Sequence, residues 1–397
     1  MADSTMMIAM VLLYSGVLIF FMYYCVMANP ETSSIARFLG YTLPDKIWSA
    51  LGSACGKRGM TVVEWITDRA LILLYIVVVH GSWSVIFAYV YPWIATQNYV
   101  SQIHRVVGGI VFAACVLTWR HACTSSPGII TKQTMHLYDH YPYDNYMFEP
   151  TLCRTRNILR PARSKFDRYK YQENVPRFDH FCGWLYNTVG ECNYRWFLLF
   201  LLVHAGMCIY GTAIVWYLFL GEVYEMGLHE AVFFDRVTGE EHHGSVWIIC
   251  QYMFARHLIE SAVLVLMAVM GIALTLFLGY HIWLTNNGLT TNESFKWGEV
   301  QRWHKNELKR YEEAVKNGEV VEQGQNKPFV SDGDVTSTPA VGGQTKVTED
   351  FDVNAIRHPG PKPVNIYNRG FWKNWEEVFF PMPIRKRKQL SVDRKNV

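Results

Sequence analysis

The sequence predicts an all-α polytopic membrane protein with about five transmembrane helices. Of its 397 residues, 50% are hydrophobic and only 18% are charged. The hydrophobic residues are gathered into long runs, and the loops between these runs differ in the sign of their charge. Such runs, separated by loops of unequal charge, are typical of proteins that cross a bilayer several times.

The first run, residues 7–27, carries no charge and is long enough to span a bilayer. A cleaved signal peptide is the competing interpretation, because residues 26–28 resemble a cleavage site. However, Asp3 and no Lys or Arg precede the run, whereas basic residues follow it. A signal peptide has the opposite flanks, so we interpret residues 1–28 as a retained transmembrane helix whose N-terminus lies outside the cytosol.

Four more runs predict transmembrane helices, at residues 70–94, 106–123, 196–220 and 258–284. In the second of these, the uninterrupted apolar core is only about fourteen residues long, so a buried or re-entrant segment is its alternative. The runs divide the chain into a helical pair within 70–123 and a second pair within 196–285, with loops and a tail between and after them.

The charge of the loops predicts the orientation of the chain. Residues 221–245 are acidic, whereas residues 124–195 and the tail 286–397 are rich in Lys and Arg. Because basic loops stay in the cytosol, we expect 29–69, 124–195 and 286–397 to be cytosolic and 221–245 to be lumenal.

The tail divides into three parts. Residues 293–316 place apolar side chains at helical spacing between charges, which predicts a cytosolic amphipathic helix. Residues 317–350 have the polar, Gly- and Ser-rich composition of a disordered linker. An aromatic motif follows at 367–379, and the basic cluster 385–388 either lies against anionic lipid headgroups or is a solvated end.

The segment Asp179-His180-Phe181-Cys182 gathers the groups that a cysteine nucleophile needs. A thiol needs a base to become a thiolate, and the base needs a carboxylate that orients it and stabilises its charged form. By itself such a string is weak support for catalysis. Short Cys- and His-containing strings also arise by chance, and a lone buried cysteine is usually inert packing. The nine cysteines show no paired spacing that predicts a disulfide framework.

Several segments resemble the DHHC-type protein S-acyltransferase (palmitoyltransferase) family. They are RPARSK at 160–165, RFDHFCGW at 177–184, NYRWF at 193–197, TTNE at 290–293 and YNRGFWKNWEEVF at 367–379. Residues 127–132 resemble the endoplasmic-reticulum and Golgi subgroup of the family. The resemblance implies an integral membrane protein of one of these organelles, with a hairpin-rich cytosolic catalytic domain at 124–195, between the third and fourth helices.

The resemblance also implies a reaction. Cys182 would accept a fatty acyl group from palmitoyl-CoA and pass it to a membrane-proximal cytosolic cysteine of a protein substrate. His180 would act as base and acid, and Asp179 would orient it. Three further residues would support the site. Thr291 and Glu293 belong to the TTxE motif, and Thr291 is expected to support Asp179. Asn374 would tie the tail to the helices. We expect no bound cofactor and no nucleic-acid partner.

The family holds its domain together with two zinc ions, and here the ligand pattern is almost gone. Only Cys153 remains of it. The other ligand positions hold Arg156, Phe166, Asp167, Lys170, Glu173, Phe181 and Thr188. Charged Arg and Lys cannot bind zinc, and neither can Phe, so we expect no structural zinc.

We hypothesise that ion pairs and aromatic packing replace the metal: Arg156 with Glu173, and Asp167 with Lys170. A buried pair contributes far less free energy than zinc, so most of the replacement would come from packing of nearby aromatic rings. These rings are Phe166, Tyr169, Tyr171, Phe178 and Phe181. The alternative is that relaxed selection left unrelated residues at these positions.

Two other functions stay open. One is a catalytically inactive scaffold or substrate-recruiting pseudoenzyme, against which the retained Cys182 and His180 argue. The other is a transporter or channel, because His204 and residues 256–260 place ionisable groups at membrane depth or its edge. However, residues 256–260 lie near an interface, where snorkelling of the side chains or a local ion pair is the favoured explanation.

Overall fold

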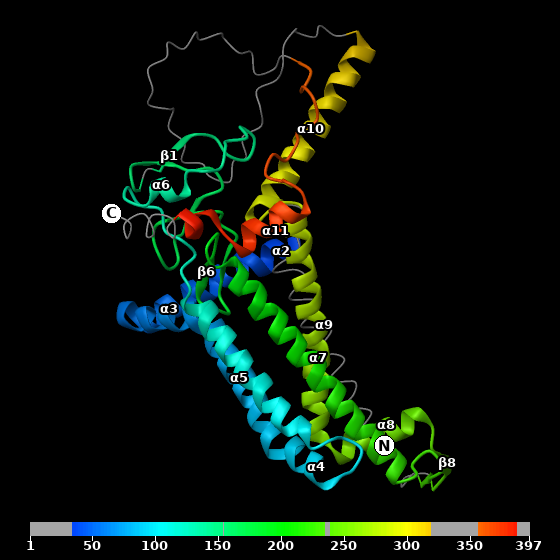
Figure 1. Ribbon diagram of the computed structural model, residues 1–397. Helices are drawn as coiled ribbons and strands as arrows, with labels where there is room; N and C mark the ends of the chain where they lie inside the picture. The colour runs from blue at the N-terminus through cyan, green and yellow to red at the C-terminus, as the bar shows by residue number, and fades with distance from the viewer. Residues whose placement is uncertain (1–33, 154, 235–238, 319–355, 387–397) are drawn as a thin grey trace. The chain divides into compact units, whose positions relative to one another are not determined.

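The computed structural model describes residues 34–153, 155–234, 239–318 and 356–386 (Figure 1). The described residues form two compact units, one within 34–112 and 206–271 and the other within 113–205 and 272–386. The long helices α5 (Ile103–Thr124), α7 (Tyr194–Glu225) and α9 (Leu258–Asn286) each contribute residues to both units.

Within the described residues, four helical segments are long and apolar enough to cross a membrane: Gly59–Thr96, Ile103–Thr124, Tyr194–Glu225 and Leu258–Asn286. They contain the four runs predicted after the first one. The weakest of these runs, 106–123, belongs to a continuous helix of 22 residues. The remaining predicted span, residues 7–27, lies outside the described residues.

The segment 29–69, which we expected to be a loop, is helical over its described residues. Helix α2 (Ser34–Arg37) passes through the π-helical turn η2 (Phe38–Thr42) into α3 (Leu43–Val85). Gly56 breaks the helical path with a φ of 63°, a left-handed conformation that glycine adopts without a steric penalty. A second π-helical turn, η3 (Ile86–Val90), leads into α4 (Tyr91–Thr96).

The rest of the first unit follows α7. A hairpin of β7 (Val232–Phe234) and β8 (Glu241–His243) precedes α8 (Val246–Arg256). The core of this unit is apolar. It includes Val90, Ile94, Val100, Val215, Leu218, Phe219, Leu228, Met253, Val263, Leu264 and Met267.

The ionisable groups that suggested a transporter have local partners. Glu222 accepts hydrogen bonds from Arg256 Nε at 2.7 Å and from His257 Nε2 at 2.9 Å. His204 Nδ1 lies 2.8 Å from the carbonyl oxygen of Phe200, one helical turn earlier. A local ion pair, the simpler of the two explanations, is therefore what the structure contains at 256–257.

The second unit is rich in hairpins, as the family resemblance implied. Three antiparallel pairs follow the short helix α6 (Met135–Tyr138). They are β1 (Thr151–Cys153) with β2 (Ile158–Arg160), β3 (Lys165–Phe166) with β4 (Asn174–Val175), and β5 (His180–Cys182) with β6 (Asn187–Val189). Their strands are only two or three residues long, so the connecting turns and side-chain contacts must fix their geometry.

Two helices complete this unit. The predicted amphipathic helix is α10 (Thr291–Asn317), which follows α9 after a short turn, and α11 (Phe371–Phe379) lies beside that turn (Figure 1). Asn374 Nδ2 donates to the carbonyl oxygen of Asn286 at 3.0 Å, and Trp375 Nε1 donates to Oδ1 of Asn286 at 2.8 Å. The aromatic motif of the tail thus packs on the end of α9, as expected for Asn374. The predicted linker lies almost wholly outside the described residues.

The turn between α9 and α10 requires glycine. Gly288 has a φ of 65°, and a Cβ there would lie 2.5 Å from the carbonyl oxygen of Tyr367 and 2.7 Å from Cα of Asn368. Both neighbours are backbone atoms, so they cannot rotate away. The C-terminal segment is therefore packed directly against this glycine.

We predict that Gly288→Ala lowers the free energy of unfolding by at least about 1 to 3 kcal/mol, because strain adds to the steric clash. The matched control is Gly298→Ala in α10, where a Cβ would meet nothing within 4 Å. That change should stabilise the helix by about 0.5 to 1 kcal/mol. Thermal unfolding of the full chain in detergent measures both, and equal midpoints would contradict the prediction.

Candidate active site

A short hairpin presents the candidate nucleophile and base side by side. In β5, His180 pairs with Val189 and Cys182 pairs with Asn187. Alternate residues of a strand face the same side, so His180 and Cys182 share one face and Phe181 points to the other. The alternation brings together the two groups that a thiol–imidazole pair requires.

Asp179 completes the group. Its Oδ2 lies 2.5 Å from Nδ1 of His180, and the residue is only 2% exposed. Because Nδ1 contacts Asp179, the other ring nitrogen of His180, Nε2, lies on the side of the ring away from that carboxylate. The order carboxylate, imidazole, thiol is the arrangement of a charge-stabilised cysteine nucleophile.

The first turn of α10 holds the carboxylate from the other side. Thr291 donates its backbone N–H to Oδ1 of Asp179 at 2.7 Å and its hydroxyl to Oδ2 at 2.9 Å. Thr290 and Glu293 form a reciprocal capping box at the start of this helix. The TTxE motif therefore fixes both the helix start and the Asp179 carboxylate.

The pKa values of this pair reflect their contacts. Burial raises the pKa of Asp179, but hydrogen bonds with His180 and Thr291 outweigh burial and hold it below its usual value. Burial lowers the pKa of His180, but hydrogen bonds with Asp179 and Cys182 outweigh it and raise the pKa to about 10. At neutral pH the site therefore favours a protonated imidazole next to Cys182.

Residues that sequence reasoning did not single out surround the imidazole. The ring of Phe197 lies 5.1 Å from that of His180, and the ring of His281 lies 6.0 Å away. The fully buried His281 shares a hydrogen bond of 3.0 Å between its Nδ1 and the hydroxyl of Tyr194. A histidine within the apolar run 258–284 is the signal that could have pointed to this position.

The first lost zinc position contains the expected ion pair. Arg156 Nη2 lies 2.8 Å from Oε1 of Glu173, and the same guanidinium donates to the carbonyl oxygen of Gln172 at 2.7 Å. Cys153 is buried nearby in an apolar cluster that also includes Phe166. The hypothesis that Arg156 pairs with Glu173 is confirmed.

At the second former zinc position, the hypothesis that Asp167 pairs with Lys170 is wrong. Asp167 accepts hydrogen bonds from the backbone N–H groups of Tyr169 at 3.0 Å and Tyr171 at 2.8 Å, so it stabilises a turn. The ammonium of Lys170 points elsewhere. It donates to the carbonyl oxygen of Cys123 at 3.3 Å and to Oδ1 of Asn187 at 3.1 Å.

Asn187 cross-links the segments around this second position. Its Oδ1 accepts from Lys170 and, at 2.9 Å, from the hydroxyl of Tyr171. Its Nδ2 donates at 2.9 Å to the carbonyl oxygens of both Ala122 and Ser125, which lie at the end of α5. Asn187 is fully buried, so this side-chain amide joins three segments beside the partner strand of Cys182.

Aromatic packing occupies the place of the lost histidine ligand. The ring of Phe181 stacks on that of Tyr169 at 4.8 Å and meets the edge of Tyr186 at 5.8 Å. Throughout the described part of the chain, no three His, Cys, Asp or Glu side chains gather as a metal-binding group. The cations and rings at the former ligand positions do not fit a structural zinc ion.

Similarity to known proteins covers both the site and most of the chain. Residues 147–298 match the family model described as DHHC palmitoyltransferase. The chain is 28% identical to palmitoyltransferase SWF1 of Yarrowia lipolytica over 346 residues, which cover 84% of each protein. It is 30% identical to palmitoyltransferase swf1 of Aspergillus fumigatus over 286 residues, which cover 62% of this chain and 70% of the relative. Palmitoyltransferase ZDHHC4 of Mus musculus is 31% identical over 185 residues, 46% of this chain and 53% of the relative.

The His180 contacts predict a pH dependence of stability. Its pKa is raised from 6.5 in the unfolded chain to about 10, so the stabilisation is complete below about pH 6.5 and is lost as pH rises through about 10. We predict that thermal midpoints fall between pH 7 and 10 in the unaltered protein and fall less in Asp179→Asn. Parallel pH profiles for the two proteins would contradict the assignment of this contact.

Proposed function

This chain belongs to the DHHC palmitoyltransferase family, and from that premise we propose that Cys182 carries the acyl group between the two half-reactions. The protein is a protein S-palmitoyltransferase, an enzyme whose family uses acyl-CoA as the donor. The observation that carries the proposal is the contact of His180 with Asp179, on the hairpin that presents His180 and Cys182 on one face.

In the first transfer, the thiolate of Cys182 attacks the carbonyl carbon of the acyl-CoA thioester. The bond from that carbon to the CoA sulfur breaks, and the protonated His180 gives its proton to the departing CoA thiolate. The acyl group is then a thioester of Cys182, and His180 is neutral. Asp179 keeps the imidazole oriented throughout.

In the second transfer, a cysteine thiol of the protein substrate gives its proton to the neutral His180. The resulting thiolate attacks the acyl-Cys182 thioester, and Cys182 leaves as a thiolate. The protonated imidazole is thereby restored next to the thiolate. Its hydrogen bond to the buried carboxylate of Asp179 stabilises the positive charge at the end of the cycle, and Thr291 supports that carboxylate.

We also propose that this domain works without structural zinc. The support is chemical: the former ligand positions hold an Arg156–Glu173 ion pair, a turn stabilised by Asp167, and the stacked ring of Phe181. These groups make cross-links of the kind that a metal otherwise supplies. Packing and hydrogen bonds must then maintain the geometry of the β5–β6 hairpin.

The charge of the loops and the family resemblance indicate on which side of the membrane the reaction takes place. The described helices include four long enough to cross a membrane, so the protein is an integral membrane protein. We propose that residues 124–195 and the tail face the cytosol, because they are basic whereas 221–245 is acidic. We further propose an endoplasmic-reticulum or Golgi membrane, because residues 127–132 resemble that subgroup of the family. The acceptors are then cytosolic cysteines close to the membrane surface.

Labelled palmitoyl-CoA tests the role of Cys182. We predict that the purified protein acquires hydroxylamine-sensitive label and that Cys182→Ser acquires none. The matched control is Cys192→Ser in the same domain, which should label like the unaltered protein. Label that persists in Cys182→Ser, or that never appears in the unaltered protein, would defeat the mechanism.

Metal analysis tests the zinc-free domain. We predict far less than one zinc ion per protein molecule by mass spectrometry of the purified full chain. A strong chelator should leave both the thermal midpoint and the labelling rate unchanged, because no structural metal contributes to folding. Zinc in a stoichiometric amount, with unfolding on chelation, is the contrary result.

A further inference from the structure

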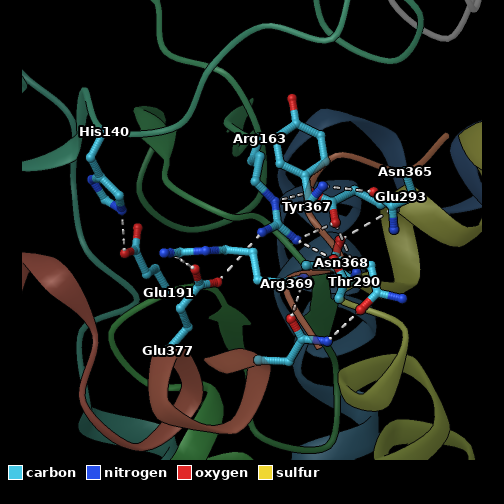
Figure 2. Close-up of polar contacts among 12 residues, drawn as sticks. His140, Arg163, Glu191, Thr290, Glu293, Asn365, Tyr367, Asn368, Arg369 and Glu377 are labelled. Atoms are coloured by element: carbon cyan, nitrogen blue, oxygen red, sulfur yellow. Dashed lines mark hydrogen bonds and ion pairs between the residues drawn. The ribbon is translucent and has the colours of Figure 1, made fainter. Parts of the chain in front are cut away.

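A buried arginine lies between the C-terminal helix and the first turn of α10. Arg163, in the turn after β2, has a side chain with 0% exposure. Its Nε donates to Oε1 of Glu293 at 2.7 Å, and its Nη2 donates to Oε2 at 2.6 Å and to the carbonyl oxygen of Gly288 at 2.9 Å. Figure 2 shows these contacts from the arginine to the Thr290–Glu293 turn. This fork-shaped contact fixes the direction of the Glu293 carboxylate.

Aromatic rings restrict the guanidinium further. Its Cζ lies 4.8 Å from the ring centre of Tyr141 and 4.6 Å from that of Tyr367. The hydroxyl of Tyr367 donates to the carbonyl oxygen of Pro142 at 2.8 Å, so that ring is held in turn. Arg163 therefore occupies a single, closely packed position.

The carboxylate that Arg163 fixes leads directly to Asp179. Oε2 of Glu293 accepts the backbone N–H of Thr290 at 3.0 Å, and the neighbouring Thr291 makes both hydrogen bonds to the Asp179 carboxylate. A tilt of Glu293 would tilt this turn of backbone. The orientation of Asp179 thus depends on the position of Arg163.

The backbone of Arg163 reaches the same place by a second route. Its carbonyl oxygen accepts the N–H of Phe178 at 3.0 Å, while the hydroxyl of Thr290 donates to the carbonyl oxygen of Phe178 at 3.0 Å. The residue directly before Asp179 is therefore held on both sides. Arg163 has a φ of 66°, an unfavourable conformation for a side chain, which indicates that its surroundings impose this backbone.

Helix α11 contributes a second carboxylate to the arginine. Oε2 of Glu377 lies 3.9 Å from Nη1 of Arg163, a nitrogen that makes no hydrogen bond within the described residues. Oε1 of Glu377 binds Arg369 Nη1 at 2.9 Å, which holds the carboxylate in place (Figure 2). The C-terminal helix thus supplies a negative charge close to Nη1, the guanidinium nitrogen of Arg163 that lacks a hydrogen bond among the described residues.

We propose that Arg163 is a positioning residue for Asp179, and that Glu377 of α11 influences acyl transfer through Arg163. The inference rests on the proposed function, because it concerns the rate at which Cys182 is acylated. It couples the docking of the C-terminal helix to the reactivity of the site. A residue that acts this way changes the rate of the chemical step and leaves the affinity for acyl-CoA almost unchanged.

Single-turnover labelling with palmitoyl-CoA at several concentrations separates these two quantities. Arg163→Lys keeps the charge and loses the fork-shaped contact. We expect its maximal rate of Cys182 acylation to fall about 10- to 100-fold, because a shift of about 1 Å in a reacting group has an effect of up to this order. The palmitoyl-CoA concentration that gives half the maximal rate should change less than about twofold.

Glu377→Gln tests the helix with a milder change, and Glu376→Gln is its matched control. Glu376 is the adjacent carboxylate on the same helix and pairs with Arg385 at 2.7 Å, away from Arg163. We expect Glu377→Gln to slow acylation about three- to tenfold and Glu376→Gln to have less than about a twofold effect. In the Arg163→Lys background, Glu377→Gln should add almost nothing, because both changes act through one residue.

The outcomes separate this inference from the proposed function. Equal rates for Glu377→Gln and Glu376→Gln, or a rise in the half-maximal concentration of palmitoyl-CoA without a fall in the rate for Arg163→Lys, would overturn the inference alone. No label on Cys182 of the unaltered protein overturns the proposed function and this inference with it. If Arg163→Lys does not fold, the comparison of the two glutamate variants decides the question.

Discussion

The hydrogen bonds from Thr291 to the Asp179 carboxylate are the contact on which the rest of the site depends. Asp179 is almost fully buried, and a carboxylate in such a place loses its proton only if donors replace the water that it gives up. Thr291 supplies two of these donors and His180 supplies the third. The ionised carboxylate then keeps His180 protonated, which is the state that the proposed acyl transfer to Cys182 starts from. Loss of the first contact would therefore disturb every later one.

The domain that presents these residues is built from very short strands, which cannot define a rigid site by their backbone hydrogen bonds alone. A metal usually provides the missing constraint in small domains of this kind. Here Asn187 makes four hydrogen bonds that join the end of α5 to the turn at 170–171 and to the hairpin of Cys182. Phe181 fills the adjacent volume by stacking on Tyr169. In the zinc-free domain that we propose, several weak and directional contacts replace a few strong ones, and the site depends more on precise packing.

Much of this arrangement could be predicted from the sequence. Specific physical reasons explain why the remainder could not. Apolar runs of membrane length predicted the four described spans, and strand alternation places Cys182 and His180 on one face. The pairing of Arg156 with Glu173 was predicted correctly, whereas Asp167 and Lys170 bind backbone groups and Asn187. Nearby opposite charges do not determine a partner, because a backbone N–H competes for each carboxylate. The roles proposed for Arg163 and Glu377 depend on contacts between residues 125 or more positions apart, which no local pattern reveals.

An experimental structure of the full chain trapped after reaction with palmitoyl-CoA tests the central claim most directly. The account predicts density for the acyl chain continuous with Sγ of Cys182, Thr291 within hydrogen-bonding distance of both Asp179 oxygens, and no metal between Cys153, Arg156 and Glu173. It is contradicted by an acyl chain on another residue, or by a Thr291 side chain that has left Asp179 in the acylated protein. Metal density at either former ligand position would equally contradict a zinc-free active domain.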